Sequence, residues 1–172
     1  MQSISPLEYL DSLLVDYSII PHSTTFTSQE TAKSVHIKGS NLGKVTVLGN
    51  DFSLFMVVIP ANHRLMLNRL ARMLNRTNLA IIPEAEFAGK FPECEPGAMP
   101  PFGRLYGMDV YVAKELVQLN TIVFNGGTHN LLIKINTFDF IDLSNASIIS
   151  DGYINIESFA HDTKRVYQAP WV

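Results

Sequence analysis

The chain has 172 residues, of which 47% are hydrophobic and 17% are charged, and its formal net charge is −3. This length suits one compact domain with a hydrophobic core, and the apolar content excludes a disordered chain. The negative charge argues against a protein that coats nucleic acid through bulk electrostatics, so a nucleic-acid partner would need a local basic patch. The single cysteine, Cys94, excludes an intramolecular disulfide and a metal site made only of cysteines.

Membrane and export signals are absent from the sequence pattern. No apolar run approaches the roughly 20 residues that a membrane-spanning helix needs. Residues 1–6 contain no basic residue ahead of an apolar stretch, as a secretory signal would. We therefore expect a cytoplasmic protein with no membrane partner.

Capping boxes predict two helices near the start of the chain. A Ser-x-x-Glu sequence beginning at Ser5, followed by apolar residues at helical spacing, predicts a helix that reaches about Tyr17. A Thr-x-x-Glu sequence beginning at Thr27 predicts a second, short helix over residues 28–35. Between them, residues 18–21 read as a short extended piece.

The next segment changes to β-prone sequence. Apolar runs at residues 45–48 and 52–59, separated by Gly-Asn-Asp, predict a hairpin that Pro60 ends. Leucines at helical spacing then predict a helix over residues 64–75, and residues 79–82 predict a short strand.

Three arginines lie away from the leucine face of that predicted helix, at Arg69, Arg72 and Arg76. Residues 61–83 contain no acidic residue, so these guanidiniums form a candidate nucleic-acid contact on a chain of negative net charge. The alternative is an ordinary solvated helix face.

Short strands and helices are mixed in the second half of the chain. A brief helix is expected from Pro83, strands over residues 109–112, 121–125 and 131–136, and one or two helical turns over residues 137–143. Hairpins dominate over regular strand–helix–strand alternation. This pattern predicts an α+β fold, a single domain with a mixed, mostly antiparallel sheet flanked by helices.

Residues 151–172 are less regular than the rest of the chain. Their apolar and aromatic side chains are too many for a free tail. We therefore expect a domain over residues 1–150 and a C-terminal extension over residues 151–172 that packs on the domain or on a partner.

The loop from Pro92 to Gly103 contains four prolines and two glycines. Proline stiffens the backbone, and glycine lets it approach a ligand closely, so such a loop could bind a substrate through its peptide groups. The alternative is a rigid connector between core elements. Within the loop, Cys94 lies between two glutamates, whose charge disfavours a thiolate nucleophile.

Two further residues are candidates for chemistry. His129 follows Gly126-Gly127-Thr128 at a predicted strand connection, where a histidine could orient a substrate or bond structurally to the turn. Lys44 begins an apolar strand, where its ammonium could pair with a phosphate or simply reach solvent. The histidines lack the spacing of a zinc site, so no metal is expected.

Together these segments resemble the YbaK/ProX family of free-standing aminoacyl-tRNA deacylases, which are related to the editing domain of bacterial prolyl-tRNA synthetase. The resemblance covers about residues 5–148, and its motifs occur in the family's order. The matching segments are Pro21-His22-Ser23, Phe26 to Ala32, Gly39 with Leu42-Gly43-Lys44, Cys94 to Gly103, Leu105 to Met108, Val110 to Val112 and Val123 to His129.

The resemblance implies a partly rolled sheet and hydrolysis of the ester that joins a wrong amino acid to the tRNA 3′ end, without a metal or other cofactor. It implies that Lys44 engages the phosphate of the terminal adenosine. The backbone from Gly97 to Pro101 would hold the aminoacyl group and the attacking water, and His129 would shape the amino-acid pocket. Further substrate-binding residues would be His22, Ala98, Met99, Pro100, Phe102, Gly127 and Thr128.

The implied partners are a mischarged tRNA and, in some settings, an aminoacyl-tRNA synthetase. Arg69, Arg72 and Arg76 would then contact the acceptor stem. The sequence departs from the family at Ala113, where the family usually has an aspartate. A non-catalytic module of the same fold, which binds tRNA ends, nucleotides or a synthetase, therefore stays open as an alternative function.

Overall fold

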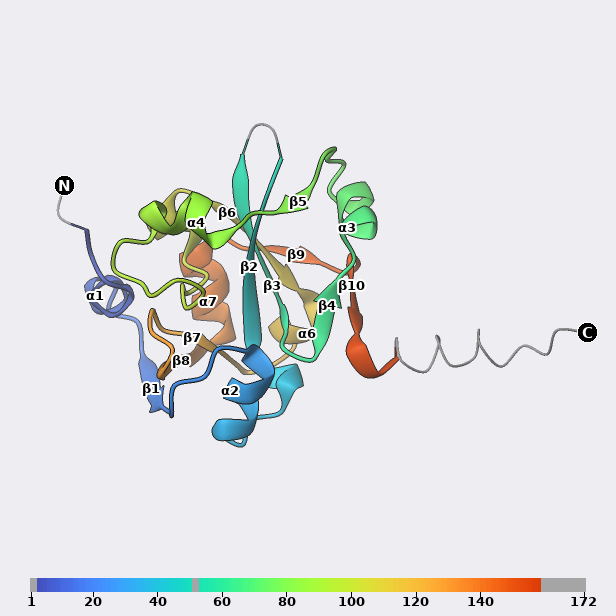
Figure 1. The fold of residues 1–172 in the computed structure, drawn as a ribbon. Helices are drawn as coiled ribbons and strands as arrows, with labels where there is room; N and C mark the ends of the chain where they lie inside the picture. The colour runs from blue at the N-terminus through green and yellow to red at the C-terminus, as the bar shows by residue number, and fades with distance from the viewer. Residues whose placement is uncertain (1–2, 51–52, 159–172) are drawn as a thin grey trace, which may run out of the picture.

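A computed structural model describes residues 3–50 and 53–158 of the chain (Figure 1). Within these residues the strands form a three-stranded, a five-stranded and a two-stranded sheet, with short helices around them. The predicted α+β class is confirmed. No helix in the described residues is both long enough and apolar enough to cross a membrane.

The first two helices begin at the predicted capping boxes. Helix α1 (Pro6–Ser12) is capped by Ser5, and α2 (Ser28–Ser34) is capped by Thr27. The prediction that the first helix reaches Tyr17 is wrong. Leu14 has a φ of 54°, which ends the helical path, and Tyr17 begins strand β1 (Tyr17–Pro21).

The three-stranded sheet is antiparallel, with the order β1-β8-β7. Strands β7 (Thr121–Asn125) and β8 (Leu131–Asn136) form its hairpin, and β1 pairs with β8 at the edge. Both hairpin strands were predicted from their apolar runs.

The five-stranded sheet has the order β5-β2-β3-β6-β9 and is mixed. Its strands are β2 (Gly43–Gly49), β3 (Leu54–Pro60), β5 (Ala80–Ile81), β6 (Asp109–Ala113) and β9 (Ser147–Ile149). The predicted hairpin is the antiparallel pair β2–β3, whereas β3–β6 and β6–β9 run parallel. A parallel bridge between Leu42 and Val123 joins this sheet to the three-stranded one, which gives the partly rolled arrangement.

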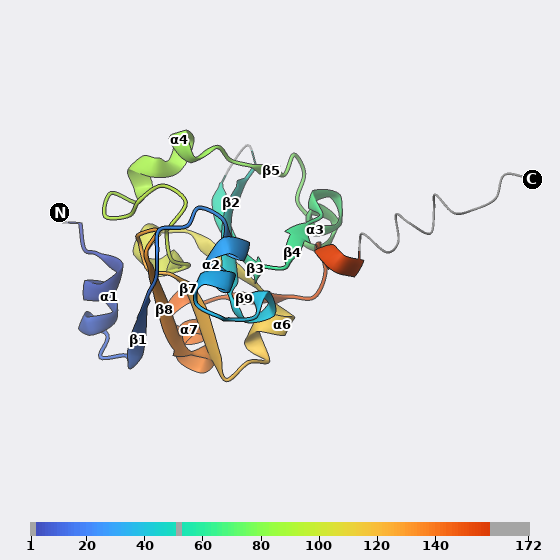
Figure 2. The same ribbon diagram turned by 60° about the horizontal axis from the view of Figure 1, so that its bottom comes forward.

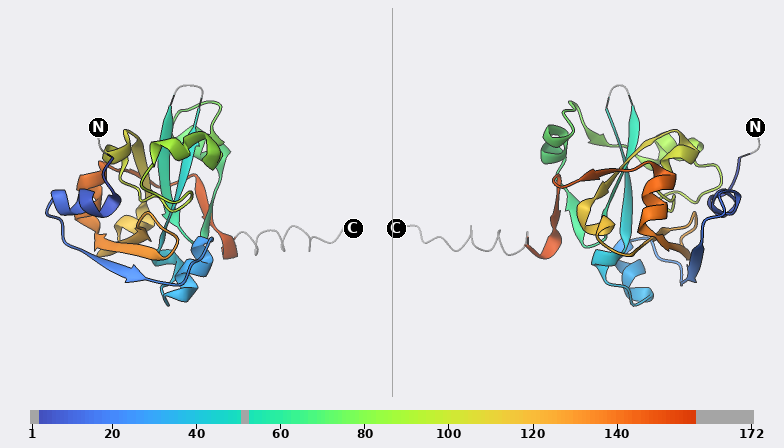
Figure 3. Two further views of the ribbon diagram at one scale, coloured as in Figure 1. Left: turned by 60° about the vertical axis from the view of Figure 1, so that its left-hand side comes forward. Right: turned by 180° about the vertical axis from the view of Figure 1, so that it is seen from behind.

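The inner core lies between these two sheets. It contains side chains from one face of each sheet, such as Met56, Val110 and Ile133, together with Leu10 from α1 and Phe102 from the proline-rich loop. Phe140 of helix α7 (Thr137–Ser144) packs in the same cluster. Seen from behind, α7 lies beside β7 and β8 (Figure 3).

Two smaller clusters cover the outer faces. Ala32 of α2 packs over Leu42 and Val123, where the two sheets join (Figure 2). On the outer face of the five-stranded sheet, Leu70 of helix α3 (Leu67–Met73) and Tyr153 pack against residues that include Phe55. Strand β3 is therefore buried on both sides, which explains its continuous apolar sequence.

The helix predicted over residues 64–75 is shorter than expected. Helix α3 spans Leu67–Met73, and Arg64 instead lies in strand β4 (His63–Leu65). Strand β4 pairs antiparallel with β10 (Tyr153–Asn155), a strand that the sequence pattern did not predict. The proposed division at residue 150 stays a prediction, because residues 159–172 lie outside the described part of the chain.

Short helical segments connect the strands. Three α-helical turns are α4 (Glu84–Phe87), α5 (Gly103–Tyr106) and α6 (Lys114–Val117), and the 3₁₀ turns are η1 (Gly39–Asn41) and η2 (Ala88–Lys90). The sequence predicted α4 from Pro83 at its start, but it predicted neither α5 nor α6, because four residues are too few to show helical periodicity.

Candidate functional site

The proline-rich loop contains a tight turn at Glu95-Pro96-Gly97-Ala98. The N–H of Ala98 donates to the carbonyl oxygen of Glu95 at 3.0 Å, and Gly97 has a φ of +81°. Proline at the second position and a positive φ at the third are typical of a type II turn. The hydrogen bond that closes the turn is donated by the N–H of Ala98, so the N–H of Gly97 takes no part in it.

This turn is attached to the Gly127–His129 turn by main-chain hydrogen bonds. The N–H of Glu95 donates to the carbonyl oxygen of Gly127 at 2.8 Å. In turn, the N–H of Gly127 donates to the carbonyl oxygen of Ala98 at 2.9 Å. Two segments about 30 residues apart in sequence thus form one backbone unit, whose peptide groups are held in place before any ligand arrives.

His129 adds two further bonds to the same unit. Its backbone N–H donates to the Glu95 carboxylate at 2.6 Å, and its ring Nε2 lies 2.7 Å from the carbonyl oxygen of Pro96. Because a carbonyl oxygen can only accept a hydrogen bond, Nε2 carries a proton and is the donor in this bond. The exposed ring of Phe26 lies 5.2 Å from the His129 ring, centroid to centroid.

Glu84 lies directly beside Gly97, and the sequence did not single it out. Its Oε1 is 2.7 Å from the position that a Cβ would take on Gly97, and the His129 ring carbon Cε1 is 3.6 Å from the same position. Glu84 opens helix α4, well before the loop in the chain, so only the fold brings the carboxylate here. The turn therefore has an acidic neighbour that can accept a hydrogen bond from a water or from an ammonium group.

The other predicted loop residues are buried. Ala98 and Phe102 have no exposed surface and Met99 has 4%, while Pro100 and Pro101 are buried as well. The Phe102 ring packs edge-on against Phe124 at 5.4 Å, within the inner core. Any role of these residues in substrate binding stays a prediction, and it would have to use backbone atoms.

His22 and Thr128 border the same turn. The N–H of His22 donates to the carbonyl oxygen of Asn130 at 2.9 Å, and the Thr128 hydroxyl donates to the side-chain oxygen of Asn130 at 2.8 Å. Nε2 of His22 is buried without a hydrogen-bond partner in the described residues. Asn130 therefore links both residues to the Gly127–His129 turn, His22 through its main chain and Thr128 through its side chain.

Lys44 lies in a different environment from the loop. Its Nζ donates to the carbonyl oxygen of His63 at 2.7 Å, and burial lowers the pKa of the ammonium. Alternation along β2 places Lys44 on the face opposite to Val45 and Val47, which pack with the inner core. In the described residues, no hydrogen bond joins Lys44 to the turn at Gly97, so the structure does not bring these two predicted residues into direct contact.

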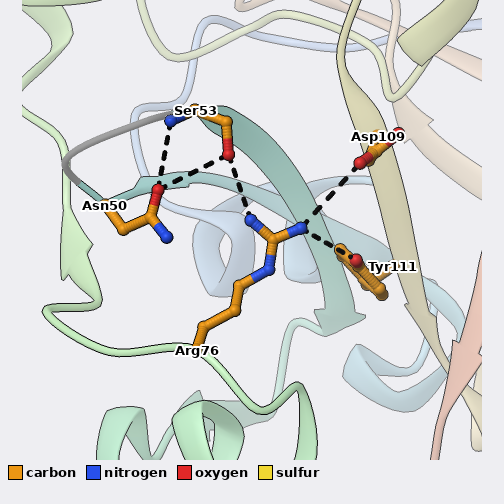
Figure 4. A network of polar contacts seen from close by, with 5 residues as sticks. All are labelled: Asn50, Ser53, Arg76, Asp109 and Tyr111. Atoms are coloured by element: carbon orange, nitrogen blue, oxygen red, sulfur yellow. Dashed lines mark hydrogen bonds and ion pairs between the residues drawn. The ribbon is translucent and has the colours of Figure 1, made fainter.

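Arg76 is engaged within the protein (Figure 4). Its guanidinium donates to the hydroxyls of Ser53 at 3.1 Å and Tyr111 at 3.2 Å, and it lies 3.9 Å from the Asp109 carboxylate. Its Cζ lies 4.5 Å from the centroid of the Phe55 ring. The guanidinium thus ties the tip of the β2–β3 hairpin to the start of β6.

The other two arginines of the expected basic face differ from Arg76. Arg69 forms an ion pair with Asp151, whereas Arg72 is exposed. The expectation of a face without acids nearby is wrong, because Asp151 and Asp109 approach from distant parts of the chain. Arg76 also lies beyond the end of α3, so the three side chains do not share one helix face.

Cys94 is partly buried and lies 3.5 Å from the Tyr106 hydroxyl. Burial raises the pKa of its thiol, the Tyr106 hydrogen bond lowers it by a smaller amount, and the charge of Glu93 adds a still smaller rise. A thiol in this environment is a poor nucleophile at neutral pH.

Comparison with known proteins identifies the fold and the family. The family model described as "Aminoacyl-tRNA editing domain" matches residues 22–143, more than half of the chain. The solved structure of the hypothetical protein APE2540 is similar with a TM-score of 0.75 at 17% identity, covering 86% of this chain and 98% of that one. A structure of a proposed trans-editing enzyme for prolyl tRNA synthetase has a TM-score of 0.71 at 19% identity, covering 87% and 98%. No match was found among curated proteins.

Proposed function

The chain belongs to the aminoacyl-tRNA editing domain family, and from this premise we propose that it hydrolyses the ester of mischarged aminoacyl-tRNA in trans. The reaction adds water across the bond between the amino acid and the ribose of the tRNA 3′ end. An activated ester of this kind needs a positioned water and stabilisation of the charge that develops on the carbonyl oxygen. Neither requirement calls for a covalent nucleophile.

The observation that carries the proposal is the hydrogen-bonded unit of the two turns. Bonds from Glu95, Gly127 and His129 fix the backbone around Gly97. A fixed N–H at Gly97 is suited to stabilise an oxyanion, since a donor that is already oriented loses little free energy to reorganisation. In this role Gly97 is the oxyanion donor, and the backbone up to Pro101 orients the acyl group.

His129 is then a residue that holds the loop and borders the acyl pocket. Its Nε2 proton is committed to the carbonyl oxygen of Pro96, so this nitrogen is not available as a general base. Glu84, beside Gly97, is placed to accept a hydrogen bond from the attacking water or from the substrate's ammonium group.

Lys44 is proposed to bind a phosphate of the tRNA 3′ end at a distance from the reacting ester. An ammonium that burial has partly desolvated binds a phosphate more strongly than a fully hydrated one. The 3′ end of a tRNA is a single-stranded chain, so one nucleotide could occupy the Lys44 position while the acyl group reaches the turn at Gly97.

The test is hydrolysis of a panel of tRNAs that carry labelled amino acids, each offered both on its own tRNA and on a mismatched one. We expect release of the amino acid from at least one mismatched pair, faster than spontaneous hydrolysis, with correctly matched pairs spared. The absence of enzyme-dependent release from all pairs would overturn the proposal.

A binding module without catalysis is the second candidate, and Ala113 favours it. The position where the family usually has an aspartate is fully buried in an apolar cluster and offers no carboxylate. This alternative predicts that the protein binds the tRNA 3′ end and protects the ester instead of cleaving it. The same panel separates the two, because protection slows the release of amino acid and catalysis accelerates it.

A further inference from the structure

The acceptor of the Lys44 ammonium belongs to a strand that depends on the C-terminal part of the domain. The acceptor is the carbonyl oxygen of His63, at the start of the three-residue strand β4. Among the described residues, the strand paired with β4 is β10, where Asn155 lies opposite His63. Strand β10 lies beyond residue 143, where the match to the family model ends.

The hydrogen-bond pattern of this ladder explains where the carbonyl of His63 points. The N–H of Ile156 donates to the carbonyl oxygen of Asn62 at 3.0 Å. The N–H of Met66 donates to the carbonyl oxygen of Gly152 at 2.8 Å. In an antiparallel pair, residues alternate between bonding to the partner strand and facing away from it. His63 occupies a position that faces away, so its carbonyl is directed from β10 towards Lys44.

Tyr153 anchors β10 to the domain. It is only 7% exposed, its hydroxyl donates to the Glu115 carboxylate, and the same hydroxyl lies 3.2 Å from the carbonyl oxygen of Ile149. Burial and the Glu115 carboxylate both raise the pKa of the Tyr153 hydroxyl, so it remains a donor at neutral pH. Its ring also lies 5.8 Å from the ring of His63, centroid to centroid.

These contacts form one connected network: Glu115 of α6, Tyr153 of β10, His63 of β4 and Lys44 of β2. Burial lowers the pKa of His63 most, and the nearby charges of Glu115, which raises it, and Lys44, which lowers it, have smaller effects. The network thus connects the C-terminal strand to the lysine through a defined series of contacts.

We propose that strand β10, anchored by Tyr153, is a positioning element for the Lys44 ammonium, so that residues beyond the family match form part of the phosphate-binding end of the site. This inference rests on the proposed function of Lys44. Tyr153 and Glu115 are positioning residues: they touch no substrate and act through β4.

The first test is a double-mutant cycle on deacylation of a tRNA that the wild-type protein hydrolyses. Tyr153→Phe keeps the buried ring and removes the hydroxyl that bonds to Glu115. We expect it to lower kcat/KM by about threefold to tenfold, mainly through KM, since one hydrogen bond is lost. In a Lys44→Ala background the same change is expected to have no effect, because the residue through which it acts is gone.

Tyr17→Phe is the matched control. It also removes a hydroxyl that donates to a carboxylate, that of Asp11 at 2.9 Å, but on β1. We expect it to leave kcat/KM unchanged in both backgrounds. Equal losses from Tyr153→Phe with and without Lys44, or no loss at all, would overturn the proposed positioning role.

A second measurement keeps this inference separate from the proposed function. The ¹³Cε resonance of Lys44 in labelled protein reports its pKa and environment without any substrate, with the exposed Lys33 and Lys134 as internal references. We expect Tyr153→Phe to shift the Lys44 resonance and to raise its pKa towards the ordinary value. If no tRNA is hydrolysed, the proposed function fails, and this spectrum still decides the positioning role. An unchanged Lys44 titration would overturn it.

Discussion

The Glu84 carboxylate occupies the space into which a side chain at Gly97 would grow. Its Oε1 lies 2.7 Å from the ideal Cβ position, and the φ of +81° at Gly97 belongs to a region that other residues rarely adopt. The backbone conformation therefore favours glycine at this turn, and a methyl group there would also have to displace the end of the Glu84 side chain.

Gly97→Ala is accordingly expected to affect both stability and activity. The left-handed backbone costs an alanine about 1–2 kcal/mol, so the free energy of unfolding should fall by that amount. The new methyl group should also push the Glu84 carboxylate away from the turn, and we expect this to lower kcat by about 10- to 100-fold. Chemical denaturation and deacylation kinetics on the same preparation measure the two effects.

Gly107→Ala is the control for backbone strain alone. Gly107 has a φ of +66°, and its ideal Cβ would meet nothing within 4 Å. A similar loss of stability with wild-type activity is expected. If Gly107→Ala reduced kcat as much as Gly97→Ala, the loss would reflect general destabilisation, and the role of the turn would be contradicted.

Lys44→Ala should lower kcat/KM for deacylation by about 10- to 100-fold, which corresponds to the loss of one charge-assisted hydrogen bond of about 1.5–3 kcal/mol. The domain should remain folded, because the side chain ends at a main-chain oxygen and not in the apolar core. Circular dichroism checks the fold. Lys134→Ala, an exposed lysine on β8, is the matched control. A Lys44→Ala protein with the wild-type rate on every hydrolysed substrate would remove this lysine from the site.

Arg76→Met should destabilise the protein by about 1–3 kcal/mol, because it removes hydrogen bonds from a charged group and a cation–π contact. Arg72→Met, on the exposed side of α3, should change the free energy of unfolding by less than about 0.5 kcal/mol. Urea denaturation of the two variants measures the contrast. Equal midpoints would mean that the network in Figure 4 contributes no net stability.

Arg72 is the arginine of the three whose guanidinium is best placed to meet a tRNA backbone, since it is exposed. If it contacts one phosphate, Arg72→Gln should reduce the slope of log binding constant against log salt by about 0.7–0.9. Hydrolysis of a minimal aminoacyl-nucleotide, which lacks the acceptor stem, should be unchanged. Filter binding of full-length tRNA at several salt concentrations provides the slope, and an identical slope for both proteins would assign Arg72 to solvent.

His63 should make the protein less stable as the pH falls. Burial lowers its pKa below the ordinary 6.5, despite the opposing charge of Glu115 and with a small contribution from Lys44. Below about pH 6.5 the unfolded chain therefore binds a proton that the folded protein does not, and the free energy of unfolding decreases. Above that pH the full stability is present.

His63→Gln should flatten this dependence, because glutamine does not titrate. Urea midpoints between pH 7.5 and 5.5 test it, with the exposed His36→Asn as the control that keeps the wild-type slope. The same decline in His63→Gln as in the wild type would show that other groups cause it.

Local sequence determined a large part of this fold. Capping boxes at Ser5 and Thr27 fixed where two helices begin, because a cap involves residues only three apart. The apolar runs predicted the strands of both hairpins, and Pro96-Gly97 is the sequence of the turn that forms. The family resemblance also pointed to Lys44, the turn at Gly97 and His129 as one set.

Only the tertiary structure decided which atoms these residues meet. Glu84 reaches Gly97, Asp151 reaches Arg69, and strand β10 reaches β4, in each case across segments with no shared pattern in the sequence. The same is true of Lys44, whose acceptor is a carbonyl oxygen and so leaves no signature in residue type. Periodicity and capping report interactions within a few residues, whereas these contacts depend on how the two sheets pack, which is settled by burial of the whole apolar surface at once.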